Sequence, residues 1–241
     1  MGATVKRGYS PDDEKEFGSQ SVPVLYNAAA DLRYLLNRGY HIKGASVFVG
    51  NHYLLSERQR LALARAVSSD DNIRARKSRE VEEIPCAATV NIDGFNTIIT
   101  LEVALSDSLL LKCMDGTVRD LAALRGTYRL IDKTGTAITL IGKMLESAKI
   151  AKAVFYLDAP VSNSGRLKQR IVELLDAYRF EVQVEVIHNV DTVLEGLDNV
   201  ITSDAIILDK CISWINLNEK IISDAIGAYP YIDFSQAAIP V

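Results

Sequence analysis

The chain has 241 residues, of which 48% are hydrophobic, and carries a formal net charge of −4 at pH 7. This length allows one large domain or two small ones, and the hydrophobic fraction suffices for a buried core. No apolar run approaches the roughly 18 residues of a membrane-spanning helix, and residues 1–17 have no hydrophobic signal core. Three widely spaced cysteines without a Cys-x-x-Cys pair indicate neither a disulfide framework nor a zinc site. The composition therefore favours a cytoplasmic protein that does not enter a membrane.

Residues 1–85 are predicted to form a helical, partly basic N-terminal domain. They contain 13 basic and 11 acidic residues, whereas residues 86–241 contain 14 and 20. Segment 21–39 has apolar residues at helical spacing and ends at a glycine. Ser56 and Gln59 have the spacing of a capping box, which predicts that another helix begins there. Segment 43–53 fits either a strand or a helix.

The pattern changes after Pro85, where we place the domain boundary. Short strand-like runs then alternate with helical segments, which predicts an α/β domain with a mostly parallel sheet flanked by helices over residues 86–241. The predicted strands cover 88–93, 109–114, 153–158, 181–187 and 200–203. The predicted helices cover 95–106, 117–124, 135–149, 164–179 and 191–199. The sequence has no glycine-rich nucleotide-binding motif.

Aspartates stand where several of the apolar strands end. Asp93 ends ATVNID, Asp158 ends AVFYLD, and Asp204 follows VITS, with Asp209 five residues further on. The carboxyl edge of a parallel sheet is where open α/β sheets bind their ligands. Carboxylates that converge there repel one another unless a cation lies between them. The pattern therefore predicts a Mg²⁺ or Mn²⁺ site suited to phosphodiester hydrolysis. Asp115, after another apolar run, is a reserve candidate.

The segment VNIDGFN at 90–96 resembles the first strand of the PIN-like nuclease superfamily, especially its NYN-type branch. In that branch a strand ends in Asp-Gly-aromatic-Asn, and a second strand-end Asp and a late Thr-Asn-Asp-type turn follow. Asp158 and the Thr-Ser-Asp at 202–204 match this order. The resemblance covers the C-terminal part of the chain. As a whole, the chain also resembles an uncharacterised two-domain family of prokaryotes.

The resemblance implies a PIN-like α/β fold and metal-dependent cleavage of RNA, most simply by an endoribonuclease. It implies that Asp93, Asp158 and Asp204 are catalytic metal ligands, with Glu102 or Asp209 completing the set. PIN-like domains often pair, so it also implies a homodimer.

Further polar residues are candidates for substrate binding. Asn96 is expected to hold Asp93 in place. Ser162, Asn163 and Ser164 crowd the start of the predicted helix 164–179, where free backbone N–H groups favour phosphate. The basic residues expected to contact a nucleic-acid backbone are Arg74, Arg76, Lys77, Arg79, Arg119 and Arg125.

Each of these patterns also has a structural interpretation. Asp-Gly is a common turn, Glu102 and Asp209 fit solvated surface positions, and a charge run often covers an exposed helix face. Two alternatives to a nuclease therefore stay open. One is an RNA-binding module with a degenerate site, and the other is a small-molecule phosphohydrolase on a similar sheet.

Overall fold

A five-stranded sheet, parallel throughout, forms the centre of the molecule. The computed structural model describes residues 5–122 and 126–237. The strand order is β5-β4-β1-β6-β7, and every neighbouring pair is parallel. The strands are β1 (Thr89–Asp93), β4 (Lys152–Asp158), β5 (Glu181–Ile187), β6 (Val200–Ile201) and β7 (Trp214–Ile215). The predicted fold class, a parallel α/β sheet flanked by helices and preceded by a helical region, is confirmed.

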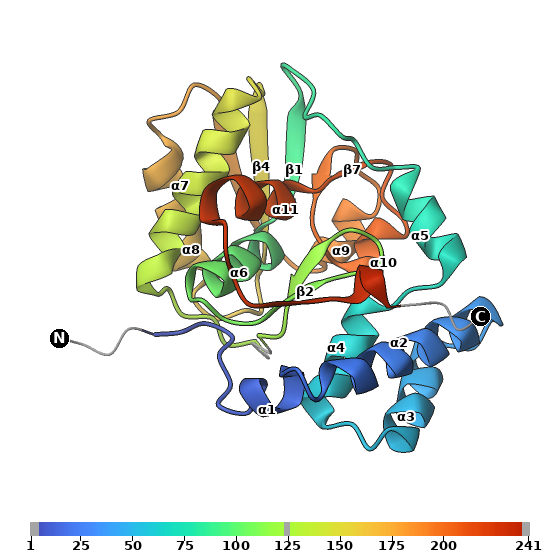
Figure 1. The fold of residues 1–241 in the computed structure, drawn as a ribbon. Helices are drawn as coiled ribbons and strands as arrows, with labels where there is room; N and C mark the ends of the chain where they lie inside the picture. The colour runs from blue at the N-terminus through green and yellow to red at the C-terminus, as the bar shows by residue number, and fades with distance from the viewer. Residues whose placement is uncertain (1–4, 123–125, 238–241) are drawn as a thin grey trace.

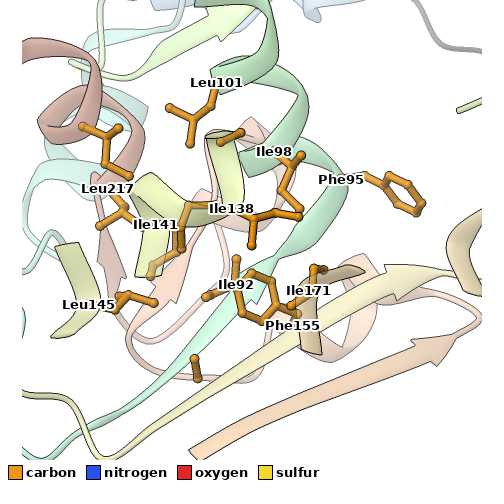
Figure 2. Packing of buried hydrophobic residues seen from close by; sticks show 14 of the residues in the cluster. Ile92, Phe95, Ile98, Leu101, Ile138, Ile141, Leu145, Phe155, Ile171 and Leu217 are labelled. Carbon is orange, nitrogen blue, oxygen red and sulfur yellow. The ribbon is translucent and has the colours of Figure 1, made fainter. Parts of the chain in front are cut away.

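One face of the sheet is covered by four helices, seen on the left of Figure 1 and near its centre. They are α6 (Gly94–Leu105), α7 (Asp132–Ser147), α8 (Ser164–Leu175) and α11 (Leu217–Ile221), with a π-helical turn at Ile222–Ile226 after the last. Figure 2 shows Ile92 and Phe155 of the strands packed among Ile98, Ile138 and Ile171 of the helices. Each fully buried side chain of this kind stabilises the fold by about 1.5–3 kcal/mol.

The opposite face carries the short helices α9 (Val190–Leu194) and α10 (Ala205–Leu208) over a smaller apolar cluster that includes Val200 and Trp214. Side chains alternate between the two faces along a strand. Because Val90 and Ile92 point into the larger core, Asn91 and Asp93 lie on the side of α9 and α10.

The N-terminal helices pack on a second, three-stranded sheet. They are α1 (Asp13–Phe17), α2 (Val22–Asn37), α3 (Ile42–His52), α4 (Glu57–Ala66) and α5 (Asp70–Lys77). The sheet has the order β3-β2-β8, from β2 (Leu110–Lys112), β3 (Val118–Asp120) and β8 (Tyr231–Asp233), and a 3-10 helix (Phe234–Gln236) follows. Leu25 and Leu63 of the helices share one hydrophobic core with Leu111 and Phe234. Residues from later in the chain therefore complete the core of the N-terminal helices (Figure 1).

Most of the predicted elements are present, and one predicted helix is a strand instead. The capping box of Ser56 and Gln59 is confirmed, and the ambiguous segment 43–53 is helical. The prediction of a helix over 117–124 is wrong for residues 117–122, because Val118–Asp120 pairs antiparallel with β2; residues 123 and 124 lie outside the described residues. This cross-strand pairing overrides the helical propensity of the segment. The predicted boundary at 85 falls between α5 and β1. Within the described ranges, no helix is both long and apolar enough to cross a membrane.

Candidate functional site

The strands β1 and β6 are neighbours in the sheet, although the chain passes through β4 and β5 between them. The chain therefore leaves β1 in one direction across the sheet and returns to add β6 on the other side. Such a reversal opens a crevice between the carboxyl ends of the two strands, where open α/β sheets bind ligands. Asp93 ends β1 at this crevice, and Thr202, Ser203 and Asp204 follow β6 directly.

Asp93 is a buried carboxylate at the centre of this crevice, only 6% exposed. The Thr202 hydroxyl donates to its Oδ2 at 2.8 Å, and the Asn96 backbone N–H donates to its Oδ1 at 3.4 Å. Burial, together with the negative charges of Asp204 and Asp191, raises the pKa of Asp93 to about 7, although both hydrogen bonds oppose the rise. No basic side chain among the described residues forms an ion pair with it. The charged form of Asp93 is therefore poorly compensated by the protein.

Hydrogen bonds join the end of β1 to the turn after β6. Asn96 Oδ1 accepts from both the backbone N–H and the hydroxyl of Ser203, each at 2.9 Å. The Thr202 hydroxyl oxygen accepts from the backbone N–H of Asp204 at 3.0 Å while it donates to Asp93. Asp204 in turn caps α10 by accepting the N–H of Ile206 at 2.8 Å. Asn96 thus joins the start of α6 to the turn after β6, while its part in substrate binding stays a prediction.

Gly94 allows α6 to approach β4 closely at the site. A Cβ atom at this position would lie 2.6 Å from Leu157 Cδ2 and 3.0 Å from the carbonyl oxygen of Tyr156. A larger residue would therefore displace the start of α6, which Asp93 caps.

Two further carboxylates extend the site on the side of β4 and β5. Asp158 ends β4, and burial raises its pKa although the N–H of Val190 opposes this. Asp191, in the first turn of α9, was not predicted as a site residue. The pKa of Asp191 is raised chiefly by burial and then by the negative charges of Asp204, Asp158 and Glu195. Asp191 therefore lies within electrostatic reach of Asp158 and Asp204, the two predicted ligands. Its position just after the carboxyl end of β5 is the signal that would have identified it.

The carboxylates have the donor chemistry of a magnesium or manganese site. In residues 5–122 and 126–237, no three Asp, Glu, His or Cys side chains form a ready metal-binding group. Mg²⁺ is commonly bound through only one or two carboxylates, with water and substrate phosphate oxygens as the other ligands. The uncompensated Asp93 and its neighbour Asp204 fit that kind of site.

Glu102 lies away from this crevice, so its prediction as a metal ligand is not supported. It is fully buried, and Arg7 Nε donates to its Oε2 at 2.8 Å while the Tyr128 hydroxyl donates to its Oε1 at 2.7 Å. The nine residues from Asp93 to Glu102 correspond to about 13 Å of helix and about two and a half turns, which turns Glu102 to the opposite side of α6. Glu102 therefore anchors the N-terminal segment through Arg7.

Asp209 and two of the predicted phosphate contacts are joined in one ion network, so the structure does not support these predictions. Arg76 binds Asp209 through two hydrogen bonds of 2.7 and 3.0 Å and donates to Asp115 Oδ2 at 2.6 Å. Arg119 donates to the same Asp115 oxygen at 2.5 Å and to the carbonyl oxygen of Ser203 at 2.6 Å. Arg76 is 2% and Arg119 is 6% exposed, which leaves neither free to bind a polyanion. The same pairing removes Asp115 as a reserve ligand.

Two family models match parts of the chain. Residues 85–220 match a family described as a domain of unknown function, DUF5616, and residues 24–79 match one described as a protein of unknown function, DUF434. The chain belongs to the DUF5616 family. The uncharacterized protein MJ0935 of Methanocaldococcus jannaschii is 38% identical over 186 residues, which cover 76% of this chain and 88% of the relative. No solved structure matches the chain. The resemblance to PIN-like nucleases remains a prediction.

The serine and asparagine side chains in the DUF5616 segment have structural contacts. Ser162 Oγ accepts the backbone N–H of Tyr128 at 3.1 Å, and Asn163 Nδ2 donates to the carbonyl oxygen of Tyr128 at 2.6 Å. Ser164 begins α8 and is 8% exposed. Ser162 and Asn163 hold the Tyr128 segment against α8, which accounts for these two side chains without a bound phosphate.

The other predicted basic contacts differ in how exposed they are. Arg79 donates to backbone carbonyls at the end of α10 and therefore has a structural role. Arg74 and Lys77 are exposed, and each pairs with an acidic residue three positions away. Arg125 lies outside the described residues.

Proposed function

We propose that the protein is a metal-dependent phosphodiesterase that cleaves RNA at the crevice between the carboxyl ends of β1 and β6. One observation carries the proposal: Asp93 is buried beside Asp204 at the switch point of the sheet, with a pKa raised to about 7. A carboxylate held in this state is suited to a ligand that carries positive charge. The resemblance of residues 90–96 and 202–204 to PIN-like nucleases supports the same chemistry.

The residues of the crevice have distinct roles in this proposal. Asp93 and Asp204 would hold a Mg²⁺ or Mn²⁺ ion, with Asp158 and Asp191 beside them. The chemistry that such an ion supplies is activation of water and neutralisation of the charge that builds on the phosphate. The Thr202 hydroxyl fixes Asp93 relative to the turn that carries Asp204.

RNA contacts outside the crevice, a homodimer and a cytoplasmic location belong to the same proposal. The exposed Arg74 and Lys77 would contact RNA outside the crevice. A homodimer would form as PIN-like domains often do. The three cysteines are all free, which agrees with a cytoplasmic location.

Cleavage of a labelled single-stranded RNA tests the proposal. The parent protein is expected to cleave with Mn²⁺ and not with EDTA, and Asp93→Asn is expected to lose about 100-fold or more of the rate. Asp176→Asn, an exposed carboxylate that ends α8, is the matched control and should cleave like the parent. Equal rates in the two variants, or cleavage that continues in EDTA, would contradict the proposal.

A second candidate is a phosphohydrolase that acts on a small ester. A cleft of about 340 Å³, which is the size of a small-molecule pocket, lies beside Asp204 and favours it. Metal-dependent hydrolysis of bis(p-nitrophenyl) phosphate by a protein that leaves RNA intact would support this candidate over the nuclease.

A further inference from the structure

We propose that the N-terminal helices complete the substrate site, with Arg65 of α4 binding a phosphate of a single RNA strand while one unpaired nucleotide occupies the cleft beside Asp204. This inference rests on the proposed function, because it takes the ligand to be RNA.

The cleft connects the carboxylates to the N-terminal helices. It has a volume of about 340 Å³, and Asn96 and Asp204 of the crevice form part of its wall. Arg65 lines it from α4, and Ile99 and Ile206 supply apolar surface. Pockets of about 300–1,000 Å³ take small molecules, so this cleft admits one nucleotide but no duplex. An RNA strand that enters it must be unpaired at that nucleotide, as is common in RNA recognition.

Arg65 is the cation of this cleft that remains open to solvent. Two arginines line the cleft, and the Arg119 side chain is 8% exposed with Nε, Nη1 and Nη2 all engaged in hydrogen bonds. The Arg65 side chain is 35% exposed and lies 3.6 Å from the Asp120 carboxylate, a loose ion pair. One of its nitrogens donates to the carbonyl oxygen of Asp120. A guanidinium has five N–H groups, so several remain for a phosphate.

Asp120 competes weakly for Arg65 because its carboxylate has other partners. Thr100 donates to Asp120 Oδ2 at 2.8 Å, and the backbone N–H of Ala122 donates to Oδ1 at 2.8 Å. A phosphate with two acceptor oxygens matches the flat guanidinium better than this carboxylate does.

Arg119 joins the backbone at Arg65 to the turn that carries Asp204. Its Nη1 donates to the backbone carbonyl of Arg65, and its Nε donates to the carbonyl of Ser203. One buried side chain thus joins α4 to the turn that carries Asp204. The cation for the strand and Asp204 of the metal carboxylates line the same cleft, which gives a polyanion a favourable contact that the carboxylates alone do not provide.

A second cleft of about 330 Å³ continues from the first towards α3. The two share Ala64, Arg119, Ala205 and Ile206 in their walls, and Tyr40 and His41 also line the second. Tyr40 is 61% exposed, and an exposed aromatic ring of this kind stacks on an unpaired base. The strand would therefore run from Asp204 past Ile206 to Tyr40.

Binding measured without cleavage tests the inference. The probe is a fluorescein-labelled 12-nucleotide oligouridylate, titrated by anisotropy in EDTA from 50 to 300 mM salt with Asp93→Asn as the parent. Adding Arg65→Gln is expected to weaken binding about 10-fold and to lower the salt slope by about 0.7, the value for one phosphate contact of a single strand. Arg65→Lys should restore most of the salt slope. Tyr40→Ala should weaken binding without changing the salt slope.

Arg170→Gln on α8 is the matched control, because that side chain is 39% exposed and paired with Glu173. The inference is overturned if Arg65→Gln and Arg170→Gln bind alike at every salt concentration, or if the parent does not bind the oligomer. It is also overturned if uridine monophosphate binds as tightly as the oligomer, because the protein would then recognise one nucleotide and not an RNA strand. Loss of binding in Arg65→Gln together with no metal-dependent cleavage by the wild type supports the inference and refutes only the nuclease.

Discussion

Replacement of Asp93 by Asn is expected to stabilise the metal-free protein, with a gain that grows as the pH rises from about 4 to about 7 and stays constant above that. The pKa of Asp93 is raised from 3.8 to about 7 in the folded protein, chiefly by burial. Between these two pH values the folded state binds a proton that the unfolded chain releases. Its contribution to stability is therefore complete below about pH 4, falls as the pH rises, and is lost above about pH 7.

The size of the effect follows from the difference between the two pKa values. One pKa unit corresponds to about 1.4 kcal/mol, so a rise from 3.8 to about 7 corresponds to about 4 kcal/mol at most. Asn keeps an acceptor oxygen for Thr202 and is as good a helix N-cap as Asp. Allowing for relaxation and for residual structure in the unfolded chain, we expect Asp93→Asn to gain about 1–3 kcal/mol at pH 8 and almost nothing at pH 4.

Urea unfolding at pH 4, 6 and 8 in EDTA measures this difference between the variant and the parent. Subtracting the free energy of unfolding of the parent from that of the variant at each pH cancels the contribution of the titrating groups that both proteins share. Asp209→Asn serves as the control of opposite sign, because it removes a carboxylate that Arg76 holds and should lower stability at pH 8. Added Mn²⁺ should stabilise the parent and not Asp93→Asn, since a ligand stabilises only the state that binds it.

A loss of more than about 1 kcal/mol in Asp93→Asn at pH 8 without metal would refute this reasoning. Asp93 would then be a structural turn residue whose charge the fold needs. A gain that is the same at pH 4 and pH 8 would also contradict it, because the raised pKa would not be the cause.

Other variants test the scaffold around the site. Asp115→Asn should lower the free energy of unfolding by about 3–5 kcal/mol in urea titrations, because it leaves two buried arginines poorly compensated; a loss below about 1 kcal/mol would mean that the ion network is not needed. Gly94→Ala should cost about 1–3 kcal/mol by the same measurement because its methyl group would overlap Leu157, and a neutral result would show that α6 can shift freely. In a native thiol titration only the exposed Cys86 should react quickly, since burial raises the pKa of the Cys113 thiol to about 12 and Cys211 is also buried. Fast labelling of a second thiol would contradict the packing.

Local patterns predicted much of the fold. The period of 3.6 residues and the end signals gave α2, and the capping box gave the start of α4. The apolar runs that end on Asp93 and Asp158 gave β1 and β4, whose alternation with helices is a property of parallel sheets. Strands of two or three residues, such as β7 and β8, are too short to leave a pattern of their own.

The candidate site was only partly visible in the sequence, because its pairings join distant segments. Arg76 lies 133 residues from Asp209 and 39 from Asp115, so a basic stretch that reads as a surface for nucleic acid is in part a buried ion network. Asp191 was missed because no apolar strand ends on it. The sequence indicated that Asn96 would hold Asp93 in place, but Ser203 as its partner became visible only once the sheet placed β6 beside β1.

A manganese-soaked crystal structure tests the central claim most directly, with the anomalous signal used to locate the ion. The account predicts an anomalous peak between Asp93 and Asp204, with carboxylate oxygens at roughly 2.0–2.6 Å, and no peak there in crystals of Asp93→Asn. A peak confined to surface carboxylates, or an empty crevice at a Mn²⁺ concentration that supports cleavage, would contradict it.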